Sequence, residues 1–465
     1  MLTRGGSGPT QSDLDCYPLP TTMPRTKYLD RLLARIASRK AVVGVVGLGY
    51  VGLPLVRAMH EAGFHVVGYD IDAAKIRKLK TGTPYLKHLG RGLVRDLSRS
   101  ARFMATNTPR DLGRCDAVAI CVPTPLGAHD EPDLSYVVRS TEMLAGVIRP
   151  GALVCLESTT YPGTTREVVK PILERAGRVC GRDVFIAFSP EREDPGRPGV
   201  ETRTIPRVVG GLDTPSTMAA ATLYGAAVDK VVPVASAEVA ESAKLLENIY
   251  RAVNIALVNE LKPVLADMGI DLWEVIGAAS TKPFGFQPFY PGPGLGGHCI
   301  PIDPYYLTYK AREYGHVTRF IELAGLVNRR MPAYVVSRLT GALNDERKAL
   351  RGSRVLVLGV AYKPNVDDVR ETPAAEIIRL LRARGAEVSY HDPHVPVFPM
   401  MRRHAVGLKS VRLTPATLRT ADAAVIVTDH ADVDYALIGR YARLIVDTRN
   451  VMASVRRPRA RIVKA

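Results

Sequence analysis

The sequence predicts an α/β protein with two doubly wound, Rossmann-like domains joined by a long central helix. Short apolar runs alternate with helical patterns up to residue 190, and the same alternation returns from residue 354. Between them, an apolar stripe at helical spacing continues without interruption from Ser236 to about Ala279. A chain of 465 residues is long enough for two or three domains, each with its own core.

Residues 25–235 are expected to form the first domain, after a mobile polar tail over residues 1–24. A short amphipathic helix around Leu29, Leu32 and Ile36 opens it, and packing on this domain is favoured over membrane association. The predicted strands are AVVGVVGLGY (41–50), HVVGYD (65–70), DAVAICVP (116–123), ALVCLEST (152–159) and VFIAFSP (184–190).

Residues 236–349 are expected to form a central helical region, whose long helix favours a homodimer or higher homo-oligomer. Residues 350–465 are expected to form a smaller second domain with a helix over 374–384. Its predicted strands are RVLVLGVAY (354–362), GAEVSYHDP (385–393), AAVIVTD (423–429) and, last, RLIVDTRN (443–450).

Composition excludes several classes of protein. There are 63 Lys and Arg against 46 Asp and Glu, a net charge of +17, but without finger spacing or an aromatic stacking stretch. Nucleic acid is therefore disfavoured, and an anionic small substrate fits the charge. No apolar run approaches the ~20 residues that span a bilayer, and no signal peptide is visible. The six scattered cysteines indicate a reducing cytoplasm, with neither a disulfide framework nor a metal site.

A dinucleotide fingerprint lies between the first predicted strand and its helix. Gly47, Gly49 and Gly52 form G-x-G-x-x-G, with Tyr50 and Val51 inside the turn. Asp70 ends the next strand, where a carboxylate would bind the adenine ribose and repel a 2′-phosphate. The pattern predicts NAD rather than NADP.

One cysteine differs from the others in its surroundings. Cys299 follows Gly296, Gly297 and His298 in a loop rich in Gly and Pro, where neighbours without side chains would let a substrate approach. Cys115, Cys121 and Cys155 lie on or beside apolar strands and are predicted to be core thiols. From the loop alone, a reactive thiol and a structural turn are both open.

The motifs GLGYVGLP, CVPTP, ESTTYPGTT, FSPEREDPG, KLLEN, GGHCIPIDP and GVAYKPNVDDVRET occur in this order over residues 40–450. In this respect the chain resembles the UDP-glucose/GDP-mannose dehydrogenase family, and most closely its UDP-N-acetylglucosamine-oxidising branch. The resemblance implies oxidation of a sugar C6 alcohol to a carboxylate with two NAD⁺ per turnover, supplying surface polysaccharide synthesis.

The resemblance also implies roles for individual residues. Cys299 would capture the aldehyde as a thiohemiacetal, which a second oxidation converts to a thioester. Lys244 and Asn248, one helical turn apart, would stabilise the developing alkoxide. A solvated helix face is the alternative interpretation of Lys244.

Three further residues map to the release of the acid. Asp303 would position Lys244 and the hydrolytic water, Glu191 would act as base or bind water, and Thr160 would orient that water. The family often has an aromatic residue directly after the Pro-Glu step, whereas this chain has Arg192, which alters the expected sugar contacts.

Cofactor and substrate contacts are implied on both sides of the central region. Thr124 and Arg370 map to the cofactor, and Lys363 and Arg449 to the UDP-sugar; interdomain ion pairs are the alternative for these cations. Some members borrow an arginine from a neighbouring subunit before the catalytic loop. TKPFGFQPFYPGPG has none, so this contact is not expected here.

Other functions remain open at this point. The same chemistry could act on UDP-glucose, UDP-N-acetylmannosamine or GDP-mannose. A two-electron hydroxyacid dehydrogenase shares the first domain and connecting helix but needs no cysteine nucleophile. Outside the enzymes, the charge leaves a nucleotide-sensing or nucleic-acid-binding module as an alternative.

Overall fold

The computed structural model describes residues 26–86, 90–127, 130–192, 202–297, 300–400 and 406–465. The tail expected over residues 1–24 and the predicted nucleophile Cys299 lie outside these ranges. The chain forms two compact units, Met1–Leu246 and Glu247–Ala465. The domain boundaries expected at residues 235 and 349 stay a prediction.

Eight strands form one sheet in the first unit, in the order β3-β2-β1-β4-β5-β6-β7-β8. They are β1 (Val42–Val46), β2 (His65–Tyr69), β3 (Phe103–Thr106), β4 (Ala117–Ile120), β5 (Ala152–Leu156), β6 (Val184–Phe188), β7 (Arg207–Gly211) and β8 (Val231–Pro233). All pairs from β3 to β6 are parallel, which confirms the doubly wound sheet. The exception is β7, which runs antiparallel to β6.

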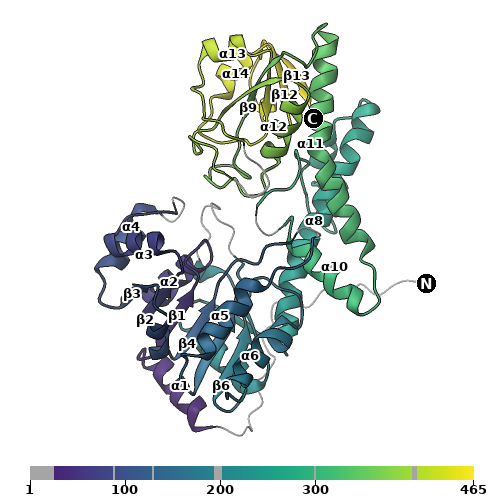
Figure 1. Ribbon diagram of the computed structural model, residues 1–465. Helices are drawn as coiled ribbons and strands as arrows, with labels where there is room; N and C mark the ends of the chain where they lie inside the picture. The colour runs from purple at the N-terminus through teal and green to yellow at the C-terminus, as the bar shows by residue number, and fades with distance from the viewer. Residues whose placement is uncertain (1–25, 87–89, 128–129, 193–201, 298–299, 401–405) are drawn as a thin grey trace, which may run out of the picture. The chain divides into compact units, whose positions relative to one another are not determined.

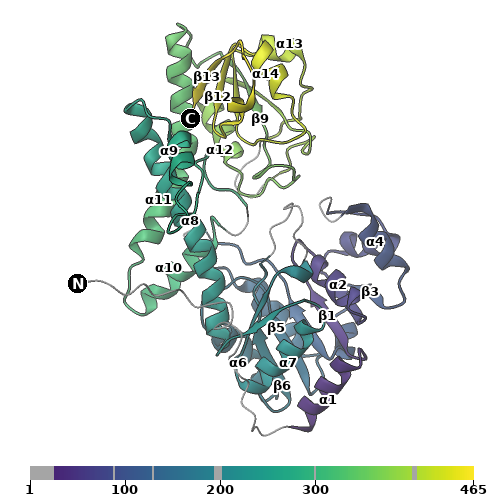
Figure 2. The same cartoon turned by 180° about the vertical axis from the view of Figure 1, so that it is seen from behind.

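Helices cover both faces of this sheet (Figure 1, and from behind Figure 2). They are α1 (Lys27–Ala37), α2 (Gly52–Glu61), α3 (Ala73–Thr81), α4 (Gly90–Arg99), η2 (Pro109–Arg114), α5 (Ser135–Ala145), η3 (Thr165–Val169), α6 (Lys170–Arg175), η4 (Thr202–Thr204) and α7 (Thr214–Gly225). One apolar core takes side chains from α1, α2 and α7, and a second core takes side chains from α5 and α6. Leu29, Leu32 and Ile36 of α1 are buried in the first core, which confirms that this helix packs on the first domain.

The long central helix is α8 (Ala237–Asp267), and the boundary between the two units falls within it. The prediction of unbroken helix to Ala279 was wrong. Gly269 adopts φ +73°, a left-handed conformation that favours glycine and ends a helix, and α9 (Leu272–Ala279) starts afresh after it. Asp271 caps α9 by accepting a hydrogen bond from the Trp273 N–H.

A second, five-stranded parallel sheet lies in the second unit, in the order β10-β9-β11-β12-β13. Its strands are β9 (Arg354–Leu358), β10 (Glu387–His391), β11 (Ala423–Ile426), β12 (Leu444–Asp447) and β13 (Arg461–Lys464). The helices of this unit beyond α9 are α10 (Asp303–Glu313), α11 (Arg319–Asp345), α12 (Pro373–Ala383), α13 (Pro415–Thr420), α14 (Tyr435–Tyr441) and the 3₁₀ turn η5 (Val451–Ser454). α11 and α12 contribute to one core of this sheet and α13 and α14 to the other.

The last strand, β13, was not predicted, because its basic residues belong to what the sequence presents as a charged tail. Arg461 pairs with Asp345 at 2.6 Å, and Lys464 pairs with Asp271. The positive charges of Arg461 and Lys464 near the C-terminus therefore form ion pairs within the second unit.

The described cysteines behave as expected for core thiols. Cys115, Cys121 and Cys155 are buried, and burial raises the pKa of Cys115 and Cys155 to about 12. Cys180 is half-buried beside Asp213, and burial raises its pKa to about 12. No helix within the described ranges is both long enough and apolar enough to cross a bilayer.

Candidate active site

The site residues of the first unit gather at the carboxyl edge of its sheet. Gly47 directly follows β1, Asp70 follows β2, and Thr124, Thr160 and Glu191 lie in the loops after β4, β5 and β6. The strand order reverses direction between β1 and β4, and open α/β sheets bind ligands at such a switch point. The fold thus brings together residues that are far apart in sequence.

The three glycines of the turn have three different roles. Gly47 has φ +93°. A Cβ on Gly52 would lie 1.8 Å from the carbonyl oxygen of Gly47, so α2 can begin this close to β1 only with glycine there. A Cβ on Gly49 would meet nothing within 4 Å. Gly49 therefore faces open space at the N-terminus of a helix, which is where a dinucleotide pyrophosphate binds.

Asp70 is buried and is held by its surroundings. Its carboxylate accepts hydrogen bonds from the backbone N–H groups of Leu48 and Asp72, each at 2.9 Å. The ammonium of Lys75, from α3, lies 3.1 Å from the same carboxylate. The sequence analysis missed Lys75, because only the geometry of the β2–α3 connection brings it back to the end of the strand.

Two loops at this edge are joined around Thr160. The Thr124 hydroxyl donates to the Thr159 carbonyl at 2.8 Å, and the Ser158 hydroxyl donates to the Val122 carbonyl at 2.7 Å. The Thr160 hydroxyl is buried but has no hydrogen-bond partner among the described residues. A buried hydroxyl without a partner is costly, so Thr160 is suited to binding something that the protein itself does not supply.

Glu191 is connected to a buried charge network that the sequence analysis missed. Arg207 of β7 lies 3.6 Å from the Glu191 carboxylate and forms a closer ion pair with Glu157. Glu157 also accepts a hydrogen bond from Tyr224, and burial raises the pKa of this carboxyl group. One guanidinium therefore serves two carboxylates. Arg207 lies beside them because it is the first residue of β7, the strand that pairs antiparallel with β6.

Glu241 ties the start of α8 to the Thr160 loop. Its carboxylate accepts hydrogen bonds from the N–H groups of Gly163 and Thr165, at 2.6 and 2.9 Å, and from the Thr165 hydroxyl at 2.7 Å. Burial raises the pKa of Glu241 to about 7. Lys244 follows on α8 and is itself buried, at 8% exposed, so the interpretation as a solvated lysine was wrong.

In the second unit, Asn248 and Asp303 are in contact, a pairing that the sequence analysis did not foresee. The Asn248 amide donates to the Asp303 carboxylate, and both side chains are buried. Asn248 lies one turn after Lys244 on α8, and Asp303 is the first residue of α10. The described part of the chain stops on either side of His298 and Cys299, between Gly297 and Ile300.

The glycines before Cys299 have a packing role that the sequence analysis did not foresee. Cβ atoms on Gly296 and Gly297 would lie 2.8 and 2.9 Å from Tyr362 side-chain atoms. The N–H of Gly297 donates to the Arg370 carbonyl at 3.0 Å. These glycines therefore let the loop lie against the segment after β9.

Lys363 and Arg449 both lie at the carboxyl edge of the second sheet, after β9 and β12. The Arg449 Nε donates to the Val427 carbonyl at 2.9 Å. Arg370 is bound by Asp368 through both of its carboxylate oxygens. The roles of these cations in binding stay predictions.

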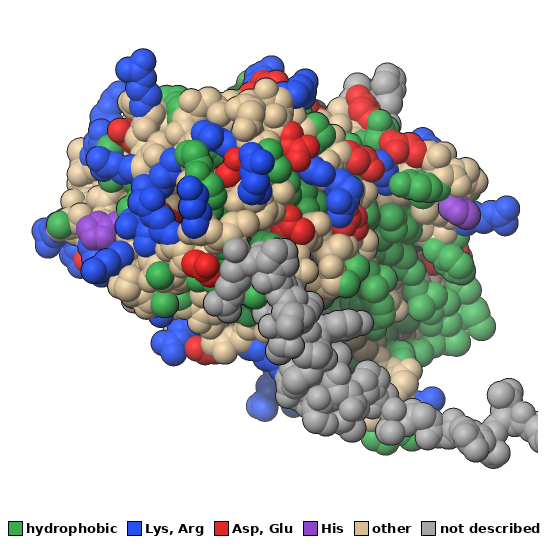
Figure 3. All heavy atoms as spheres, turned by 90° about the horizontal axis from the view of Figure 1, so that it is seen from below, with side chains coloured by type: hydrophobic (Ala, Val, Ile, Leu, Met, Phe, Trp, Pro, Cys, Tyr) green, Lys and Arg blue, Asp and Glu red, His purple; other side chains and the backbone are tan. Residues whose placement is uncertain are grey.

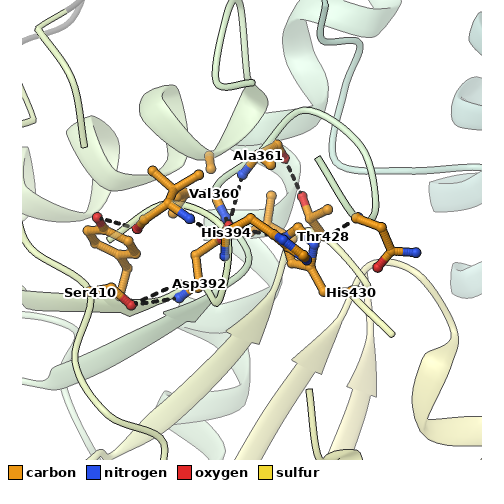
Figure 4. Close-up of polar contacts among 12 residues, drawn as sticks. Val360, Ala361, Asp392, His394, Ser410, Thr428 and His430 are labelled. Atoms are coloured by element: carbon orange, nitrogen blue, oxygen red, sulfur yellow. Dashed lines mark hydrogen bonds and ion pairs between the residues drawn. The ribbon is translucent and has the colours of Figure 1, made fainter. Parts of the chain in front are cut away.

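Figure 4 shows the polar contacts of Asp392, the acid that follows a strand of the second sheet. Asp392 follows β10 as Asp70 follows β2, but its carboxylate accepts hydrogen bonds from Val360, Ala361, Val395, the His394 N–H and the His430 ring. These interactions lower the pKa of Asp392 to about 2, although its burial opposes them. Asp392 is 2% exposed, and its carboxylate therefore serves to hold the loops at this edge of the second sheet together.

Three domains of one protein family match consecutive parts of the chain. The NAD binding domain of the UDP-glucose/GDP-mannose dehydrogenase family matches residues 41–228, the central domain of that family 238–330, and its UDP binding domain 356–454. The chain is 37% identical over 366 residues to a UDP-N-acetyl-D-glucosamine 6-dehydrogenase of Pseudomonas aeruginosa, covering 78% of this chain and 85% of that one.

Other relatives carry a different substrate in their names. A UDP-N-acetyl-D-mannosamine dehydrogenase of Pyrococcus horikoshii is 36% identical over 418 residues, covering 88% of this chain and 96% of that one. A solved structure of the UDP-D-ManNAc dehydrogenase from Pyrococcus horikoshii superposes with a TM-score of 0.81 at 33% identity, covering 91% and 98% of the two chains.

The fold and the site thus define an NAD-dependent oxidoreductase. The chain belongs to the UDP-glucose/GDP-mannose dehydrogenase family, the nucleotide-sugar dehydrogenases.

Proposed function

We propose that this enzyme oxidises the C6 alcohol of UDP-N-acetylglucosamine to the carboxylate, supplying an aminouronic acid for surface polysaccharide. The main support is the unpartnered, buried hydroxyl of Thr160 at the same sheet edge as the glycine turn. An oxidation that stops at a carbonyl needs no residue to hold water, whereas release of an acid from a thioester does. UDP-glucose, UDP-N-acetylmannosamine and GDP-mannose are the alternative substrates.

In the proposed mechanism, NAD⁺ accepts the hydride in each of the two oxidations. Lys244 and Asn248 donate hydrogen bonds to the substrate oxygen as negative charge develops on it. The Cys299 thiolate adds to the aldehyde carbon, which gives a thiohemiacetal and, after the second oxidation, a thioester.

Hydrolysis completes the proposed reaction. Thr160 holds the water, and Glu191, oriented by Arg207, accepts its proton as the oxygen attacks the thioester carbon. The C–S bond then breaks, which releases the carboxylate and returns the Cys299 thiolate. Asp303 orients Asn248 through their hydrogen bond and contributes to the position of Lys244.

A panel of nucleotide sugars with NAD⁺ tests the substrate, with NADH and product mass as the readouts. We expect acid from UDP-N-acetylglucosamine, a mass gain of one oxygen and a loss of two hydrogens. Exclusive turnover of another sugar of the panel would contradict the choice of substrate but not the chemistry.

Substitution of Cys299 tests the covalent step. We expect Cys299→Ala to abolish acid formation while NAD⁺ still binds. Cys180→Ala is the matched control, because this thiol lies beside Asp213, away from the proposed site, and its loss leaves acid formation intact. Acid at the wild-type rate from Cys299→Ala would contradict the proposed nucleophile.

We further propose a homodimer built on α8. The helix leaves a stripe of large apolar side chains exposed, at Val239, Leu246, Tyr250, Leu257, Leu261 and Val264. Figure 3 shows hydrophobic side chains gathered at one side of a face that otherwise carries charges of both signs. Exposed apolar stripes on long helices are typical of subunit interfaces.

A further inference from the structure

A buried lysine without a partner lies on α8. Lys262 is 6% exposed, and its ammonium has no hydrogen-bond acceptor in the part of the chain that the structure describes. Buried lysines are rare unless they are paired, because loss of hydration disfavours the charged form. The ammonium is already enclosed by residues of its own unit, so a second subunit docked on the outside of α8 would not supply the missing acceptor.

The charges around Lys262 do not compensate it. It faces Arg338 of α11 and Arg449 after β12, and Asp447 is the one acid facing it among the described residues. The Asp447 carboxylate already accepts hydrogen bonds from the N–H groups of Arg449 and Met452, each at 2.9 Å. The Nε of Arg338 is also buried without a partner. Arg449 also forms an ion pair with Asp429 at 3.9 Å. The cationic cluster of Lys262, Arg338 and Arg449 therefore faces two carboxylates, Asp429 and Asp447, among the described residues.

The cluster is held at the loop that leads to Cys299. Asn259, one turn before Lys262, accepts a hydrogen bond from the Gly292 N–H at 2.9 Å and donates one to Asn328 of α11 at 2.9 Å. A Cβ on Gly292 would lie 2.8 Å from the Nη1 atom of Arg449. The Gly/Pro loop thus packs directly on the guanidinium of the cluster.

We propose that Lys262 and Arg338, through their positive charge, strengthen the contact with a phosphate group of the UDP-sugar that is already expected of Arg449. This inference rests on the proposed function. The Arg449 side chain keeps 22% of its surface exposed beside Asp429, so a ligand can touch it. Lys262 is a positioning residue that acts through Arg449.

The proposal predicts that Lys262 takes up a proton when the substrate binds. Burial, assisted by repulsion from Arg449 and Arg338, lowers the pKa of Lys262 to about 7, while Asp447 acts in the opposite direction. A bound phosphate would offset the repulsion and raise this pKa. At pH 8 the free enzyme holds Lys262 mostly neutral, so substrate binding takes up a proton. Well below pH 7 the lysine is already charged and no uptake is expected.

Calorimetric titration of UDP-N-acetylglucosamine into the full-length enzyme without NAD⁺ tests this, with UDP-glucose as a second probe. Both probes are phosphodiesters and do not titrate near pH 8, unlike a phosphomonoester with its pKa near 6. Measurements in two buffers of different ionisation enthalpy report the protons taken up. We expect uptake by the wild type at pH 8, and in Lys262→Met no uptake and an affinity lower by about tenfold.

Two further variants make the result specific. Lys262→Arg keeps a permanent charge, so it should retain most of the affinity but show no proton uptake. Lys409→Met, at an exposed lysine, is the matched control and should behave as the wild type. Lys262→Met should also melt at a higher temperature, because it removes a buried amine that has no hydrogen-bond partner among the described residues.

Unchanged affinity and proton uptake in Lys262→Met would overturn this inference and leave the proposed function standing. Failure of the wild type to bind either probe while it binds NAD⁺ would overturn both.

Discussion

Among single residues, Gly49 and Gly52 of the NAD turn have separable roles. We expect Gly49→Ala to leave the melting temperature near that of the wild type and to weaken NAD⁺ binding by about tenfold or more, because its methyl group would point into the ligand's space. Gly52→Ala should lower the melting temperature, since overpacking against backbone costs about 1–3 kcal/mol. Thermal unfolding and NAD⁺ titration measure both effects; a stability loss in Gly49→Ala with unchanged affinity would contradict this assignment.

Thr160 gives a second test at the scale of one residue. Thr160→Val keeps the shape but removes a hydroxyl without a partner, so stability should be unchanged or higher. Acid release should slow by about tenfold to a hundredfold, with the thioester accumulating on the enzyme. Thr141→Val is the control, because its hydroxyl donates to the Val137 carbonyl at 2.8 Å and its loss should cost stability only. Equal rates of acid release in the wild type and Thr160→Val would contradict the proposal that Thr160 holds the hydrolytic water.

Among the elements, β10 and β11 are joined through Asp392 and His430. The pKa of Asp392 is lowered from 3.8 to about 2, so this carboxylate stabilises the folded unit above about pH 4. That contribution, about 2 kcal/mol, is lost as the pH falls toward 2.

Chemical unfolding at pH 3 and pH 5 measures this contribution. Trp273, the single tryptophan, lies in the second unit and reports on it. We expect Asp392→Asn to be less stable than the wild type at pH 5 and to show a smaller change between the two pH values. The same change in both proteins would contradict the role given to Asp392.

Several strands and buried charged residues were not predicted from the sequence. Strands with continuous apolar runs were predicted, whereas β3 and β8 are short and partly exposed, and β7 begins with a buried arginine. β13 has only two apolar residues, Ile462 and Val463, between two basic ones, and it was not predicted. Arg207, Lys75 and Lys262 have no local motif, and only their three-dimensional surroundings show that they face carboxylates or other cations.

For the whole molecule, the exposed stripe of α8 predicts the oligomeric state. We expect Leu257→Glu, at a side chain that is 52% exposed, to convert the dimer to a monomer, because a charge cannot be buried without a partner. Val397→Glu, at an apolar residue outside α8 that is 55% exposed, should remain a dimer. Light scattering coupled to size exclusion measures both. A wild-type monomer, or a dimer unaffected by Leu257→Glu, would contradict the proposed interface.

The sequence was sufficient to predict two Rossmann-like domains and an NAD site, since the glycine motif and the motifs after β4, β5, β6 and β9 lie at strand ends that the alternation already defines. The sequence did not show how Thr160 and Glu191 are supported. Their supports come from β7 and α8, which follow much later in the chain.

The central claim is a four-electron oxidation, and the ratio of NADH formed to sugar consumed tests it most directly. With limiting UDP-N-acetylglucosamine and excess NAD⁺, the account predicts two NADH per sugar and the carboxylate as the final product. One NADH per sugar, with the aldehyde or a ketone as the final product, would contradict it.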